Sequence, residues 1–268
     1  MNTPLDWAGF GAVTPLALAV LCVAAFVAGA VDAIVGGGGL VQLPAMLLFS
    51  PGGAAVHSLA TNKVASVFGT ASAAVGYARR VRIDWAHALP MALIALCGAL
   101  GGARLAAALP SKILTIVVLV ALIAVGLYIW RRPELGVVHA PRFARHHQLL
   151  AMCAGGLLIG FWDGLAGPGT GSFLVFWLVA VVGFGFLDAS ATSKIVNTAT
   201  NFGALLFFVP AGVVLVGLGV VMALCNVAGS LIGARLAIRK GTGFVRTVFL
   251  VVVCALILSL VWKIVRAG

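Results

Sequence analysis

The chain has 268 residues, of which 63% are hydrophobic and only 9% are charged, and its mean hydropathy is +1.20. A soluble domain carries about 25% charged residues, so this chain has too few charges to cover a water-exposed surface. The composition excludes a soluble enzyme or binding domain and predicts an all-α polytopic membrane protein. At roughly 20 residues per span, the length allows about eight to ten membrane crossings.

The net charge, the cysteines and the histidines indicate which partners and bound groups this chain is not expected to have. The net charge of +11 comes from short basic clusters between apolar runs, so we expect no nucleic-acid partner. The five cysteines contain no C-x-x-C pair, and the five histidines show no ligand spacing. We therefore expect no disulfide framework, no metal site and no cofactor.

Apolar segments predict the membrane helices in chain order. In the first half they cover residues 15–35, 39–50, 56–78, 86–108 and 112–130. In the second half they cover residues 148–166, 170–184, 189–209, 213–236 and 245–263. The first segment is longer than the core of a signal peptide, so we interpret it as a retained helix.

The two halves are internal copies within a single transmembrane domain, residues 1–268. Repeat 1 covers 12–130, a basic cytoplasmic linker covers 131–147, and repeat 2 covers 148–266. Adding 131 to a residue number in repeat 1 gives the equivalent residue in repeat 2 without a gap. The matching residues include rare intramembrane charges, namely Asp32 with Asp163, Lys63 with Lys194, and Arg104 with Arg235.

Basic clusters predict how the repeats are oriented. Three clusters, within residues 79–82, 131–145 and 235–246, are placed in the cytoplasm by the positive-inside rule. The link near Pro210–Gly212 carries no charge and is predicted to lie outside. Each repeat then crosses the membrane an odd number of times, so repeat 2 is inverted relative to repeat 1.

A glycine-rich break precedes the short segment of each repeat and predicts a binding site. Inverted repeats with matching broken helices are typical of secondary transporters, whose sites lie at the repeat interface. The N-terminus of a half-helix favours an anion. The alternative is that the glycines only allow close helix packing. The candidate residues in the breaks GGGG and GPGTG are Gly36, Gly37, Gly38, Gly39, Gly167, Gly169 and Gly171.

Two lysines lie about two turns inside apolar segments, Lys63 in LATNKVAS and Lys194 in SATSKIVN. A charge at the membrane centre costs about 2.5–3.5 kcal/mol on insertion scales, which makes such a residue a functional candidate. The alternative is that each side chain extends to the interface. Because the two positions match, we expect both lysines to line one central anion site. Further polar candidates are Gln42, Asn62, Ser66, Thr170, Ser172, Asn197 and Asn201.

Asp32 and Asp163 stand just before the two breaks. They are candidate proton carriers for coupled transport or counter-charges of the lysines, and both roles stay open. The sequence lacks the motifs that the enzymatic alternatives require. GPGTGS lacks the lysine of a phosphate loop, and the chain has neither the G-x-G-D of intramembrane aspartyl proteases nor a G-x-S-x-G nucleophile elbow.

Arginine and glycine motifs recur near the end of each repeat. Arg104 and Arg235 end GGAR and IGAR, and inversion places them on opposite faces of the membrane. They are candidate gates, or cations placed at helix C-termini, which the helix dipole favours. The G-x-x-x-G motifs at 98–102 and 229–233 predict closely packed helices.

These motifs resemble the TauE/SafE sulfite-exporter family, the toluene-sulfonate uptake permeases, and within it the YfcA-like branch of membrane transporter proteins. GAVDAIVGGGGLVQLPAML and LATNKVASVFGT are similar to the family's first repeat. GFWDGLAGPGTGSF, ATSKIVNTATNFGALLFF and GARLAIRKG are similar to its second repeat. The resemblance covers nearly the whole chain. It implies a bacterial inner-membrane carrier for small anions, with sulfite and organosulfonates as substrates of some members.

Together these features predict a secondary transporter of a small anion, such as sulfite, an organosulfonate or a related sulfur oxyanion. Transport would proceed by alternating access between the repeats, with export as the expected direction. The alternatives are a non-transporting membrane protein, either a scaffold or an intramembrane enzyme, and an anion channel. The expected partners are the small anion and the lipid bilayer, and the sequence is compatible with a homodimer.

Overall fold

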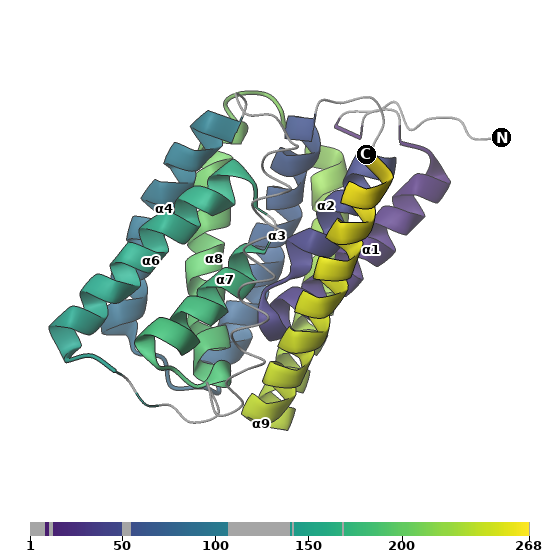
Figure 1. Ribbon diagram of the computed structural model, residues 1–268. Helices are drawn as coiled ribbons and strands as arrows, with labels where there is room; N and C mark the ends of the chain where they lie inside the picture. Colours follow the sequence, from purple (N-terminus) through teal and green to yellow (C-terminus); the bar gives the residue numbers. More distant parts are fainter. Residues whose placement is uncertain are drawn as a thin grey trace.

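The computed structural model describes residues 9–10, 13–49, 55–106, 140, 142–167 and 169–267, and the regular elements within these ranges are helical (Figure 1). The first half contains α1 (Pro15–Val35), α2 (Gly38–Phe49), α3 (Ala55–Ala78) and α4 (Trp85–Ala106). The second half contains α6 (Arg145–Leu165), α7 (Thr170–Trp177), a π-helical continuation η1 (Leu178–Val182), α8 (Phe186–Phe208) and α9 (Val216–Ala267). The predicted segment 112–130 and most of the linker 131–147 lie outside the described residues.

Local sequence explains where the helices begin and end. At the start of α1, Thr14 Oγ1 accepts a 3.2 Å hydrogen bond from the N–H of Ala17, and Pro15 occupies the first turn, where its missing N–H costs nothing. Gly36 ends α1 with a φ of 83°, a left-handed conformation that glycine adopts without strain. α9 joins the last two predicted segments, and Gly241 interrupts it with a φ of 72°.

Within the described residues, four helices are long and apolar enough to cross a membrane: α1, α4, α6 and the Val216–Val248 part of α9. Their outer faces expose large apolar side chains that lipid can cover, among them Leu16, Leu93, Leu158 and Leu224. α3 and α8 are also long, with 24 and 23 residues, but they are more polar. They lie in the middle of the bundle between the α1–α9 and α4–α6 pairs (Figure 1). The chain is therefore a multi-pass membrane protein whose polar side chains on α3 and α8 are largely buried inside the bundle.

Glycines allow the outer helices to pack closely. α1 packs against α9 and α4 packs against α6, so each contact joins a helix of the first half to one of the second. A Cβ at Gly229 or Gly233 would overlap main-chain oxygens of α1. A Cβ at Gly98 or Gly102 would overlap main-chain oxygens of α6 in the same way. The prediction that both G-x-x-x-G motifs serve close packing is confirmed.

Gly102→Ala should lower the free energy of unfolding by about 1–3 kcal/mol, because the new Cβ meets the main-chain oxygen of Phe161 and forces α4 away from α6. Gly101→Ala is the matched control. Its Cβ would lie 3.8 Å from the nearest atom outside its own helix, in the Phe161 ring, and alanine favours the helix by up to about 1 kcal/mol. Thermal unfolding of both purified variants in detergent checks this. Equal stability of the two variants would contradict the packing role of Gly102.

Candidate functional site

The two helix breaks meet inside the bundle. Gly36 separates α1 from α2, while Gly167 and Gly169, with φ values of 81° and 82°, separate α6 from α7. The N–H of Ser172 donates a 2.7 Å hydrogen bond to the main-chain oxygen of Gly36. A Cβ at Gly171 would overlap the main chain of Gly36. The start of α7 is therefore held directly against the end of α1.

A polar cavity of about 270 Å³, including its mouth, lies at this meeting point. Both halves contribute to its lining, and every lining residue belongs to the candidate set drawn from the sequence. The lining residues are Asp32, Gly36, Gly39, Asn62, Lys63, Ser66, Asp163, Gly167, Gly169, Thr170, Gly171, Asn197 and Asn201.

Two buried ion pairs cross between the halves beside the cavity. Lys63 Nζ in α3 lies 2.6 Å from Asp163 Oδ1 in α6, and Lys194 Nζ in α8 lies 3.2 Å from Asp32 Oδ2 in α1. The two lysine side chains are 1% and 0% exposed, so neither ammonium extends to the outside of the bundle. Each pair offsets the desolvation of its charges by direct contact. The aspartates are thus counter-charges in this structure, and their role as proton carriers stays a prediction.

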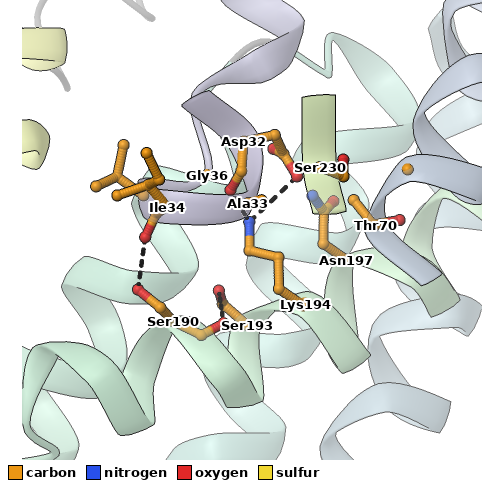
Figure 2. A network of polar contacts seen from close by, with 12 residues as sticks. Asp32, Ala33, Ile34, Gly36, Thr70, Ser190, Ser193, Lys194, Asn197 and Ser230 are labelled. Atoms are coloured by element: carbon orange, nitrogen blue, oxygen red, sulfur yellow. Dashed lines mark hydrogen bonds and ion pairs between the residues drawn. The ribbon is translucent and has the colours of Figure 1, made fainter. Parts of the chain in front are cut away.

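The two ion pairs differ in their surroundings. Lys194 also donates a hydrogen bond to the main-chain oxygen of Asp32, as Figure 2 shows, and Lys194 is not part of the cavity lining. Lys63 lines the cavity together with Asp163, whose Oδ2 has no hydrogen-bond partner in the part of the chain that the structure describes. Asn62 Oδ1, also in the lining, is buried without a partner there as well. Two acceptor oxygens near Lys63 therefore have no donor among the described residues.

Hydrogen bonds along the walls hold the cavity in shape. Asn201 Nδ2 donates a 2.7 Å hydrogen bond to the main-chain oxygen of Asn197, one turn earlier in α8. Thr170 Oγ1 donates a 2.8 Å hydrogen bond to the main-chain oxygen of Gly167, which orders the break before α7. These side chains fix the α8 wall and the start of α7 relative to the two lysines.

Several candidate residues lie beside the cavity rather than in its lining. Gln42 of α2 is buried, and its Oε1 accepts a 2.9 Å hydrogen bond from Asn226 Nδ2 of α9. Gly37 is buried in the first break, and Gly38 lets α2 pack against Asp32. Ser172 binds the end of α1, as described above. These residues support the walls in this structure.

The candidate gates Arg104 and Arg235 are not brought into the cavity. Both side chains are exposed, Arg104 in the last turn of α4 and Arg235 within α9. A cation in a last turn interacts favourably with the helix dipole, which accounts for Arg104. A gating function for either arginine stays a prediction.

Sequence reasoning missed residues that hold the end of α1. Tyr77 Oη of α3 donates a 2.9 Å hydrogen bond to the main-chain oxygen of Ala33. Ser190 Oγ of α8 donates a 3.0 Å hydrogen bond to the main-chain oxygen of Ile34 (Figure 2). A polar residue in an apolar segment is a signal that it has a partner. The partners here are distant main-chain oxygens, which no sequence pattern identifies.

A bundle of apolar helices around broken helices and a small polar cavity is the architecture of a membrane transporter. Residues 21–260 match the family model described as Sulfite exporter TauE/SafE. The chain belongs to this family, as its motifs indicated.

Several relatives are similar to this chain in sequence along most of its length. The chain is 40% identical over 243 residues to the probable membrane transporter protein ORF9 of Sinorhizobium sp, which covers 91% of this chain and 92% of that protein. It is 34% identical over 241 residues to the probable membrane transporter protein YfcA of Escherichia coli K12, covering 90% and 88%. A probable membrane transporter protein of Haemophilus influenzae is 31% identical over 229 residues, covering 85% and 88%. No solved structure matches the chain. The family and its relatives indicate a membrane transporter rather than an enzyme.

Proposed function

We propose that the protein is a secondary transporter of the bacterial inner membrane that exports a small anion, such as sulfite, an organosulfonate or a related sulfur oxyanion. The observation that carries this proposal is a buried cavity, lined by Lys63, at the point where both helix breaks meet. The name of the family, Sulfite exporter TauE/SafE, supports the substrate class and the direction.

The cavity offers the chemistry that an anion needs. Lys63 supplies a positive charge, which is felt more strongly in a low-dielectric interior than in water. The starts of α2 and α7, at Gly39 and Thr170, add main-chain N–H groups and the positive ends of two helix dipoles. An incoming anion competes with Asp163 for Lys63. A proton taken up by the displaced carboxylate would keep the buried charge balanced, which couples anion movement to proton movement.

The proposal includes two inverted repeats related by a pseudo-two-fold axis through the cavity. The reciprocal helix contacts and the reciprocal ion pairs, which both exchange under the 131-residue offset, support this relation. Rotation of one half against the other about such an axis would open the cavity to each side of the membrane in turn.

Inversion predicts that the two ends of the α6–α8 segment lie on opposite sides of the membrane. In a background without native cysteines, Phe143→Cys should react from the cytoplasm and Ala211→Cys from outside, because basic residues surround Phe143 and are missing around Ala211. Both positions are exposed. A membrane-impermeant thiol reagent on intact cells and on inverted vesicles measures this. Labelling of both positions from one side would refute the inversion.

Lys63→Gln should weaken anion binding by about ten- to a hundredfold, since a charge-assisted hydrogen bond is worth about 1.5–3 kcal/mol. A thermal-stabilisation screen of the parent protein against sulfite, thiosulfate, sulfonates and carboxylates first identifies the ligand. A ligand at a hundredfold excess over Kd adds about 2.7 kcal/mol. Arg239→Gln is the control, because Arg239 is exposed in α9 and outside the cavity lining. Parental affinity of Lys63→Gln would mean that the anion binds elsewhere.

Coupling through a carboxylate predicts that Asp163→Asn or Asp32→Asn abolishes uphill transport and leaves substrate exchange in the folded protein, although loss of the counter-charge lowers its stability by about 3–5 kcal/mol. The amide cannot take up a proton but still occupies the same volume. Proteoliposomes with and without an imposed pH gradient separate the two activities. If both variants fail to fold, the aspartates serve only as structural partners of the lysines and the coupling hypothesis is wrong.

The alternative functions are distinguished by flux. Saturable uptake into proteoliposomes is expected of a carrier, and a scaffold or intramembrane enzyme would produce none. A channel would conduct far faster than an alternating carrier and would not saturate at low anion concentration.

A further inference from the structure

We propose that the two buried lysines, although equivalent in sequence, have different functions. Lys63 binds the transported anion directly, whereas Lys194 is a positioning residue that holds the end of α1 and does not contact the anion. The inference rests on the proposed transport function and assigns the residue that its anion contacts.

The ammonium of Lys194 is already committed to the end of α1. The last main-chain oxygens of a helix have no partner within the helix. The oxygen of Asp32, in the last turn of α1, accepts a 2.8 Å hydrogen bond from the N–H of Gly36 and a second one from Lys194, which also contacts Asp32 Oδ2 at 3.2 Å. Figure 2 shows Lys194 extending from α8 toward Asp32. Because Lys194 has no place in the cavity lining, its ammonium is not available to a ligand in the cavity.

Three further side chains complete the cap of α1. They come from three different helices and donate to main-chain oxygens that follow Asp32. The donors are Tyr77 of α3, Ser190 of α8 and Ser172 of α7, which bind the oxygens of Ala33, Ile34 and Gly36, respectively. The end of α1 is therefore fixed to α3, α7 and α8 at once, and Lys194 is one member of this cap.

The other half of the chain lacks the residues of this cap. Under the 131-residue offset the three donors correspond to Phe208, Leu59 and Val41, whose side chains have no hydrogen to donate. Phe208 and Leu59 instead pack in one apolar cluster. In the break after α6, Thr170 Oγ1 binds the oxygen of Gly167, a contact within the break itself. The residues equivalent to these three donors therefore cannot cap the end of α6.

Within the described residues, the ammonium of Lys63 makes fewer polar contacts than that of Lys194. Its ammonium contacts Asp163 Oδ1 and lines the cavity, where a Cβ at Gly167 would lie 3.2 Å away. Asp163 Oδ2 stays buried without a partner within the described ranges. An anion that reaches Lys63 has to displace one contact, whereas an anion at Lys194 would also disrupt the cap of α1. The cavity therefore presents a single lysine, Lys63, to its ligand.

Two charge-neutral double variants test this assignment. The first combines Lys63→Gln with Asp163→Asn, and the second combines Lys194→Gln with Asp32→Asn. Neutralising both partners avoids an unpaired buried charge, which would destabilise either protein for a trivial reason. The probes are sulfite, thiosulfate and methanesulfonate at one fixed pH, and the readouts are Kd and the unfolding temperature without ligand.

The first double variant should unfold within a few degrees of the parent and bind the anion at least about tenfold more weakly. The second should unfold several degrees lower, because α1 loses part of its cap, and should lose less affinity than the first, because Lys194 is outside the cavity lining and Asp32 alone of this pair lines the cavity. If the second variant does not fold, Ser190→Ala, which removes a single bond of the cap, takes its place with the same expectation. The reverse pattern, or equal losses in both variants, would overturn the assignment.

Thiol labelling tests the assignment without any known substrate. In a background without native cysteines, Lys63→Cys should react with the anionic reagent 2-sulfonatoethyl methanethiosulfonate and Lys194→Cys should not. Methanesulfonate should slow the reaction at position 63, and it is preferable to sulfite, which cleaves the disulfide formed. Equal reactivity at both positions would contradict the different roles. If the parent binds none of the probes, the transport proposal fails, while labelling and unfolding still decide whether the lysines differ.

Discussion

The desolvation of two buried lysines is the constraint on which the rest of the structure depends. An unpaired charge inside a membrane protein costs several kcal/mol, so each ammonium requires a carboxylate in contact. The chain pairs residues from opposite halves, Lys63 with Asp163 and Lys194 with Asp32. The contacts that neutralise the charges therefore also join the halves, and they do so beside the cavity. Removing one partner of such a pair typically costs about 3–5 kcal/mol of stability. The same ion pairs therefore stabilise the fold and form part of the site.

The distribution of polarity among the helices follows from this centre. α3 and α8 carry the lysines on their buried faces, and the outer helices α1, α4, α6 and α9 pack against them, while Phe68 of α3 and Phe202 of α8 are exposed on the outside of the bundle. Close packing of the outer helices requires glycine at the contacts, where any side chain would overlap main-chain oxygens of the facing helix. Irregular backbone at the breaks is tolerated because it faces a cavity and protein groups instead of lipid. The apolar outer helices, the glycines at their contacts and the broken helices are thus all related to the polar groups buried inside the bundle.

Positions that match under the 131-residue offset do not acquire the same contacts. The end of α1 is capped by Tyr77, Ser172, Ser190 and Lys194, whereas the equivalents of the first three are the apolar residues Phe208, Val41 and Leu59. Side-chain donors rigidify a helix end, while apolar contacts allow it to shift without leaving a polar group unsatisfied. The proposed carrier needs one part of its site to be firm and another to change its contacts, and this difference would supply both.

The sequence by itself determined the protein class, most helix boundaries and both breaks, and it gave a wider set of polar and glycine residues that contains the cavity lining. These features are encoded locally: hydropathy gives the spans, glycine the breaks, and rare intramembrane charges mark the site. Only the tertiary structure decided that Lys63 pairs with Asp163, that Lys194 binds the end of α1 outside the cavity lining, and that Ser190 caps that end. The last two contacts join residues 162 and 156 positions apart, and the angles at which the helices cross decide which donors reach which oxygens. Equivalent sequence positions therefore acquire different partners once the halves pack together.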